Sequence, residues 1–162
     1  MSRLDSFIAR LSAQRELLNW AIGWVAGREG LILEVGLGNG RTYDHLRAGL
    51  GADRIYAFDR ANNANPLSIP PAGRLVLGEF GDSLQTFAAR HPGAAVLVHS
   101  DVGLGDPEAN ARQVIQMSGW LPPLLGRGAL LLSDQKLTHP DLLLQPVPVP
   151  IPSDRYFVYL KA

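Results

Sequence analysis

The sequence predicts a three-layer α/β fold, in which a mostly parallel β-sheet lies between two layers of helices. Two observations support this prediction. Short apolar runs that suit buried strands alternate with segments of helical periodicity along most of the chain. The first of these runs, residues 31–35, stops at a cluster of glycines, as a strand does where it turns into a helix in this class of fold. The 162 residues suit one domain, spanning 1–162.

An amphipathic helix is predicted over residues 3–28, ahead of the first strand. Apolar residues recur there at intervals of three and four, from Leu4 to Val25. Ser2 and Asp5 have the spacing of a capping box, and Gly27 and Gly30 end the periodic stretch. Residues 1–30 are therefore expected to form an N-terminal helical extension of the domain.

Strands and helices then alternate, bounded by glycine, proline and asparagine. Residues 60–73 are rich in Asn and Pro and predict a loop without a long helix. Prolines at 146, 148, 150 and 152 force an extended chain with few backbone donors. Strands are expected at 31–35, 54–58, 75–80, 94–99, 129–133 and 155–161, and helices at 41–50, 82–90 and 108–121.

The composition argues against several classes of protein. Lys+Arg and Asp+Glu both number 15, so a neutral chain offers no electrostatic attraction for nucleic acid. Cysteine is absent, which excludes disulfides, thiolate metal sites and thiol redox motifs. No apolar run approaches the roughly 18 residues of a membrane span, and charges interrupt the N-terminus too often for a signal peptide. We therefore expect a cytoplasmic protein without a membrane or nucleic-acid partner.

The most informative segment is the glycine cluster after the first strand, Gly36-x-Gly38-x-Gly40. Glycines permit a tight turn and let a ligand approach the backbone, and the helix that follows offers free N–H groups to an anion. A dinucleotide fingerprint needs a small residue at position 41, where this chain has Arg41. Glu34 stands two residues before the first glycine.

Glu34-x-Gly36-x-Gly38-x-Gly40 resembles the first motif of class I S-adenosylmethionine-dependent methyltransferases. The resemblance covers residues 31–134 and implies a Rossmann-like sheet of seven mostly parallel strands with an antiparallel C-terminal strand. Residues 135–154 leave little room for the family's last helix, so we expect the fold to be trimmed there. The resemblance implies S-adenosyl-L-methionine as cofactor, with its ammonium attracted by Glu34, directly or through water. Its carboxylate would be held by the loop amides and Arg41.

Two further acidic residues match the cofactor pocket of this family. Asp59 ends the second strand, 19 residues after Gly40, where a carboxylate accepts both ribose hydroxyls; dinucleotide enzymes share this feature. Asp82 follows the third strand, where the resemblance implies a contact to the adenine amine, and the residue also suits a helix N-cap. The predicted cofactor-binding residues are Glu34, Gly36, Gly38, Asn39, Gly40, Arg41, Asp59, Arg60, Asp82, Ser83, Ser100 and Asp101.

The methyl acceptor of this family lies beyond the fourth and fifth strands, which end in His99-Ser100-Asp101 and Ser133-Asp134-Gln135. Cation-dependent O-methyltransferases of the catechol type carry an Asp and an Asp-Asn pair there. Asp101, Asp134 and Gln135 are similar, which makes an Mg²⁺ site with these ligands one hypothesis, although Gln is longer than Asn. Acidic residues also commonly end strands and cap helices. Without a metal, Asp101 or His99 becomes the candidate base, and Asp134 completes the set of candidate catalytic residues.

The function expected from these features is methyl transfer from S-adenosylmethionine to a small molecule, with O-methylation as one form of it. No appended substrate-recognition domain is evident, which favours a small acceptor or a site completed by the second subunit of a homodimer. Two alternatives stay open. One is an S-adenosylmethionine-binding protein without activity. The other is an NAD-dependent oxidoreductase, against which Arg41 argues.

Overall fold

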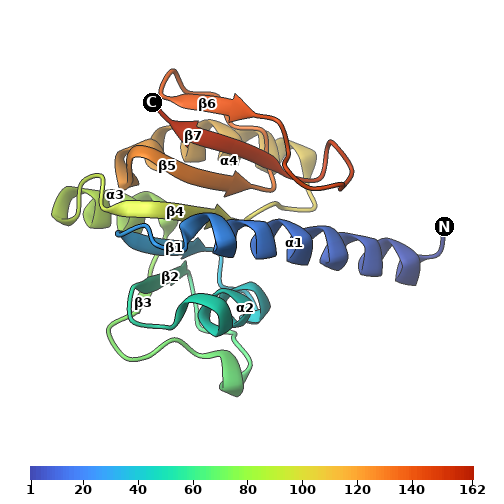
Figure 1. The fold of residues 1–162 in the computed structure, drawn as a ribbon, viewed down its shortest axis with the longest axis horizontal. Coiled ribbons are helices and arrows are strands. Elements are labelled where there is room, and N and C mark those ends of the chain that lie inside the picture. Colours follow the sequence, from blue (N-terminus) through green and yellow to red (C-terminus); the bar gives the residue numbers. More distant parts are fainter.

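A seven-stranded sheet forms the centre of the protein, in a computed structural model that describes all 162 residues. The strand order is β3-β2-β1-β4-β5-β7-β6 (Figure 1). Strand β7 runs antiparallel to both β5 and β6, and the other neighbours pair in parallel. In chain order the elements are α1 (Arg3–Val25), β1 (Leu31–Val35), α2 (Arg41–Leu50), β2 (Ile55–Asp59), η1 (Pro66–Ser68), β3 (Leu75–Leu77), α3 (Phe80–Arg90), β4 (Ala95–Ser100), α4 (Pro107–Trp120), η2 (Pro122–Leu124), β5 (Leu125–Ser133), β6 (Leu142–Gln145) and β7 (Phe157–Lys161).

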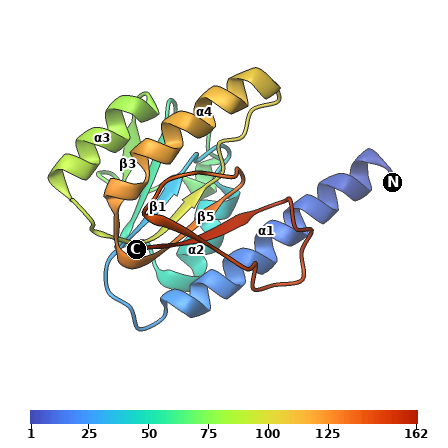
Figure 2. The ribbon, with the colours of Figure 1, turned by 90° about the horizontal axis from the view of Figure 1, so that it is seen from above.

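Helices cover both faces of the sheet, with α3 and α4 on one side and α1 and α2 on the other (Figure 2). Because side chains alternate along a strand, β1 contributes to two separate cores. Leu33 and Val35 belong to the cluster under α3 and α4, and Ile32 belongs to the cluster under α1 and α2. The predicted three-layer, Rossmann-like fold is confirmed.

Most of the expected elements are present, with shifted ends. The capping box of α1 forms, since Ser2 Oγ accepts from the Asp5 backbone N–H and the Asp5 carboxylate accepts from Ser2. The expected strand 75–80 is wrong at its end: β3 stops at Leu77, Gly78 follows at φ +146°, and Glu79 caps α3. The leucine-rich strand β6 was not predicted, so the sheet keeps seven strands and only the last helix is missing.

The proline-rich segment takes the place of that helix. Residues 146–152 alternate between exposed prolines and half-buried aliphatic side chains. Val147, Val149 and Ile151 pack against the core on the side of α1 and α2. The segment forms no helix, but the predicted extended chain is wrong over residues 148–151, where the backbone bends and the Ile151 N–H donates to the Val149 carbonyl oxygen at 2.9 Å.

Helix α1 is longer than the sheet it covers. Its C-terminal half buries Leu17, Leu18 and Ala21 in the core, whereas Leu4 and Ile8 near its start remain exposed. The N-terminal half projects beyond the carboxyl ends of the parallel strands (Figures 1 and 2). This overhang forms a wall beside the edge of the sheet where ligands of such folds bind. None of the helices combines the length and apolar character needed to cross a membrane.

Candidate functional site

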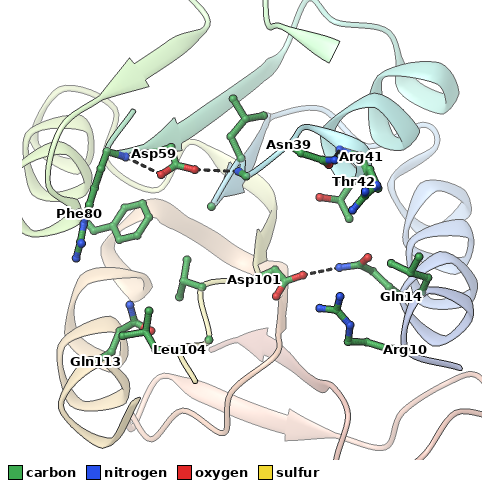
Figure 3. Close-up of a pocket in the computed structure, with 17 residues that line it drawn as sticks. Arg10, Gln14, Asn39, Arg41, Thr42, Asp59, Phe80, Asp101, Leu104 and Gln113 are labelled. Atoms are coloured by element: carbon green, nitrogen blue, oxygen red, sulfur yellow. Dashed lines mark hydrogen bonds between the residues drawn. The ribbon is translucent and has the colours of Figure 1, made fainter. Parts of the chain in front are cut away.

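A cavity of about 340 Å³ opens at the carboxyl ends of β1, β2 and β4. Figure 3 shows side chains from several elements facing it: Phe80 and Gln113 at one end, Arg10 and Gln14 of α1 at the other, and Asp59 and Asp101 between them. Of the predicted cofactor-binding residues, the cavity is lined by Gly36, Gly38, Asn39, Arg41, Asp59, Arg60 and Asp101.

The three glycines of the turn are required for different reasons. Gly36 has φ +91°, and a Cβ there would lie 2.5 Å from the Asp101 carbonyl oxygen. Gly40 has φ +89°, and a Cβ there would lie 2.7 Å from the Cβ of Ser68. These two glycines therefore let neighbouring segments pack against the turn. A Cβ on Gly38 would meet no atom within 4 Å, so the turn leaves open space beside the cavity at this position.

Asp59 is oriented by the backbone around it. Its two carboxylate oxygens accept from the Gly38 N–H at 2.9 Å and the Arg60 N–H at 2.7 Å. Each oxygen keeps a lone pair for another donor. Asp59 lines the cavity, so this arrangement suits two neighbouring ligand hydroxyls, as predicted for ribose.

The residues after β3 differ from the expectation. Because α3 begins at Phe80, Phe80 lines the cavity and Asp82 lies in the first turn of the helix. Asp82 faces adjoining hollows, and Ser83 is buried with a hydroxyl that has no partner. Glu79 pairs with Arg60 at 3.0 Å. The sequence analysis missed Phe80; the signal was Gly78, which ends the strand three residues early.

Glu34 is fully buried and does not line the cavity. It accepts from Thr42 Oγ1 at 2.6 Å and lies 2.9 Å from Nδ1 of His99, which is also buried. Burial lowers the pKa of His99, but the Glu34 carboxylate opposes this effect, and the pKa is raised overall. Glu34 and His99 thus form a buried ion pair that joins β1 to β4. The structure shows no direct path from Glu34 to a ligand in the cavity.

Two carboxylates converge beside the cavity. Asp101 lies after β4 and accepts a hydrogen bond from Nε2 of Gln14 in α1. Asp134 lies after β5 and accepts from the Gly103 N–H at 2.8 Å. Burial and the neighbouring Asp101 raise the pKa of Asp134 to about 6. Burial and the same two carboxylates also raise the pKa of Tyr156. The pair of carboxylates therefore holds a proton more readily than a single aspartate does.

The Mg²⁺ hypothesis is not supported. Asp101 and Asp134 meet as that hypothesis required, but Gln135 points elsewhere, since its Nε2 donates to Oδ1 of Asn110 at 2.9 Å. The structure contains no group of three or more His, Cys, Asp or Glu side chains placed to hold a metal ion. Gln135 fails as a ligand because its longer side chain reaches the α4 residue Asn110.

The remaining predicted residues lie outside the cavity lining. Gly40 supports the turn from behind, and Ser100 is buried, with its carbonyl oxygen accepting from the Asp134 N–H at 3.1 Å. The residues missed by the sequence analysis come mainly from helices whose packing no motif reveals. They are Arg10, Leu11, Gln14, Leu37, Thr42, Phe80, Val102, Gly103, Leu104 and Gln113.

The chain is similar to known proteins along its whole length. The profile of a family described as S-adenosyl-L-methionine methyltransferase matches residues 1–161. The crystal structure of an S-adenosyl-L-methionine methyl transferase from Silicibacter pomeroyi superposes with a TM-score of 0.92 at 38% identity, covering 100% of this chain and 99% of that chain. No functionally curated protein matches the sequence significantly.

More distant structures share the fold alone. The Escherichia coli protein yhhF, a proposed methyltransferase, has a TM-score of 0.58 at 15% identity, with 90% of this chain and 84% of that chain covered. A Staphylococcus aureus protein, proposed to be a caffeoyl-CoA O-methyltransferase, has a TM-score of 0.60 at 10% identity, with 90% and 82% covered. Given the profile match over nearly the whole chain and the 38% identity to the Silicibacter pomeroyi protein, this chain belongs to the S-adenosyl-L-methionine methyltransferase family.

Proposed function

We propose that this methyltransferase acts on a small-molecule acceptor whose nucleophilic atom carries a proton, and that Asp101 removes this proton. The observation that supports the proposal is the pair of carboxylates, Asp101 and Asp134, at the end of β4 and β5 and beside the cavity. A phenol or other hydroxyl and an amine both meet this description, so O-methylation remains one form of the proposal.

The residues of the cavity fit the cofactor of the family. Asp59 offers two oriented oxygens to the ribose hydroxyls, and the open space at Gly38 lets a ligand reach the backbone. Arg41 and the amides at the start of α2 suit the carboxylate of the methionine end. S-adenosyl-L-methionine supplies an electrophilic methyl group on a sulfonium. Glu34 acts at a distance in this proposal, because it fixes Thr42 and His99 and does not face the cavity.

The chain contributes position and proton transfer to the reaction. The cavity would position the acceptor beside the reactive methyl group of the cofactor, and such positioning by itself supplies a large part of the acceleration. A carboxylate oxygen of Asp101 would accept the proton that the acceptor atom loses on taking the methyl group, with S-adenosylhomocysteine as the leaving group. Gln14 fixes the orientation of Asp101, and Asp134 lies close enough to raise the affinity of the pair for that proton.

Calorimetric titration of S-adenosyl-L-methionine into the wild-type protein and Asp59→Ala tests the cofactor site. We expect saturable binding by the wild-type protein and a loss of about 100-fold or more in the variant, because two charge-assisted hydrogen bonds to ribose disappear. Normal binding by the variant would contradict the assignment of Asp59.

A panel of phenols, amines and carboxylic acids, assayed for transfer of a labelled methyl group, tests the acceptor class. Turnover that depends on Asp101 supports the proposal. Tight cofactor binding without turnover on any acceptor would favour a cofactor-binding protein, and turnover unaffected by Asp101→Asn would refute the role of Asp101.

A further inference from the structure

Gln113 on α4 has no role in the proposed reaction, although its side chain faces the site. It is 8% exposed and lines both the cofactor cavity and the adjoining hollow formed by Arg60, Glu79 and Phe80. Figure 3 shows it opposite Phe80, at the end of the cavity away from Gln14 and Arg10. The Oε1 atom of Gln113 is buried and has no hydrogen-bond partner.

The other two buried glutamines each use their carboxamide in a hydrogen bond to a neighbouring side chain. Nε2 of Gln14 donates to Asp101, and Nε2 of Gln135 donates to Asn110. A buried carbonyl oxygen without a partner is unfavourable, and native proteins rarely retain one without a reason. The unpaired carboxamide at the wall of a ligand cavity therefore points to a ligand group that completes its hydrogen bonds.

The position of Gln113 identifies that group. With ribose at Asp59, the part of the cofactor that extends toward Phe80 and Arg60 is the base, and Gln113 lies beside this end. A carboxamide presents one donor and one acceptor in a plane, which matches the amino group and adjacent ring nitrogen on an edge of adenine. Rotation about the last side-chain bond exchanges the amide oxygen and nitrogen, so either can face the base.

We infer that Gln113 is a specificity-determining residue that reads the adenine edge of the cofactor, accepting from the 6-amino group and donating to a neighbouring ring nitrogen. This inference rests on the cofactor placement in the proposed function. It gives to Gln113 the contact that the sequence suggested for Asp82, which lies in the adjoining hollows and not in the cavity.

The test compares S-adenosylhomocysteine with its analogue in which hydrogen replaces the 6-amino group. Calorimetry measures both dissociation constants for the wild-type protein, Gln113→Leu and Gln116→Leu. Gln116 lies one turn further along α4, is exposed, and borders only the adjoining hollow, so it provides a matched control. We expect the wild-type protein and Gln116→Leu to bind S-adenosylhomocysteine about tenfold more tightly than the analogue. Gln113→Leu should bind the two within about twofold of each other.

The outcomes separate the inference from the proposed function. If Gln113→Leu binds S-adenosylhomocysteine and still prefers it about tenfold, the inference is overturned while the cofactor site stands. If the folded wild-type protein binds neither compound, the proposed function fails first. If Gln113→Leu does not fold, Gln113→Glu serves as the second variant. Its side chain has the shape of glutamine but lacks the N–H donor. That variant must weaken S-adenosylhomocysteine binding at least about fivefold, and an unchanged affinity would overturn the inference.

Discussion

Asp59 and Asp101 both follow the ends of parallel strands and line one cavity, yet their surroundings differ. Asp59 is held by two backbone N–H groups from the residues around it. Asp101 faces a second carboxylate, Asp134, and a glutamine from the distant helix α1. Backbone donors hold a carboxylate as a fixed acceptor, which suits binding. A neighbouring carboxylate raises proton affinity, which suits proton transfer. These surroundings fit the proposed roles, binding for Asp59 at the end of β2 and proton transfer for Asp101 at the end of β4.

The largest expected effect is on the rate of methyl transfer, and it distinguishes the role of Asp101 from that of Asp59. Asp101→Asn should lower the rate of methyl transfer by about 10² to 10⁴, because it removes the proposed general base, while cofactor affinity stays within about fivefold of wild type. Transfer assays at saturating cofactor measure the rate, and calorimetry measures the cofactor affinity. The converse pattern, lost affinity with a retained rate, would show that the two aspartates have the opposite roles.

A second prediction concerns the ion pair between Glu34 of β1 and His99 of β4. Strand β1 lies between β2, which ends in Asp59, and β4, which precedes Asp101. His99→Leu leaves the Glu34 carboxylate buried without its cationic partner. We expect a loss of about 3–5 kcal/mol in the free energy of unfolding, measured by urea denaturation. Adding Glu34→Gln to this variant should restore part of the loss. A loss below about 1 kcal/mol in the single variant would mean that the pair is not ionised.

The sequence was sufficient for the residues at the strand ends and the glycine turn, and insufficient for the helix residues at the two ends of the cavity. The turn at Gly36–Gly40 and Asp59 follow each other along the chain with fixed spacing, so a local motif reveals them. Gln14 and Gln113 reach the cavity only through the way α1 and α4 pack on the sheet, and no spacing along the chain encodes that packing. Phe80 was hidden for a smaller reason, because apolar residues on both sides of Gly78 predicted one longer strand.

The raised pKa of Asp134 predicts how stability depends on pH. In the folded protein its pKa is about 6, against 3.8 for the free side chain, so the folded state binds more protons than the unfolded state between these values. The free energy of unfolding should therefore fall as pH rises from about 4 to 6, and stay lower above that. Asp134→Asn cannot ionise, so it avoids this loss of stability. It gives up one hydrogen bond from a backbone amide, which offsets part of the gain. The variant should therefore be more stable than wild type at pH 8 by about 1–2 kcal/mol. Thermal denaturation at pH 4 and pH 8 measures the difference, and equal stabilities of the two proteins at pH 8 would contradict it.

The smallest effect is expected at Gln14. Gln14→Leu removes a hydrogen bond to Asp101 but neither carboxylate. The transfer rate should fall about tenfold, because the side chain that orients Asp101 is gone, while the affinity for S-adenosyl-L-methionine stays near that of the wild type. Transfer assays and calorimetry measure the two quantities. An unchanged rate would assign Gln14 to packing alone.

The proline-rich segment, residues 146–152, affects the unfolded chain as well as the folded one. Each of its four prolines has φ fixed near −65° before folding begins, so the unfolded ensemble has fewer conformations to lose. At about 0.4–1 kcal/mol for each proline in a compatible position, the segment loses roughly 2–4 kcal/mol less conformational free energy on ordering than a chain without prolines. Val147, Val149 and Ile151 can therefore cover the core without the hydrogen bonds of a helix. The smaller loss of conformational entropy on folding thus favours a packed segment that has no helical hydrogen bonds of its own.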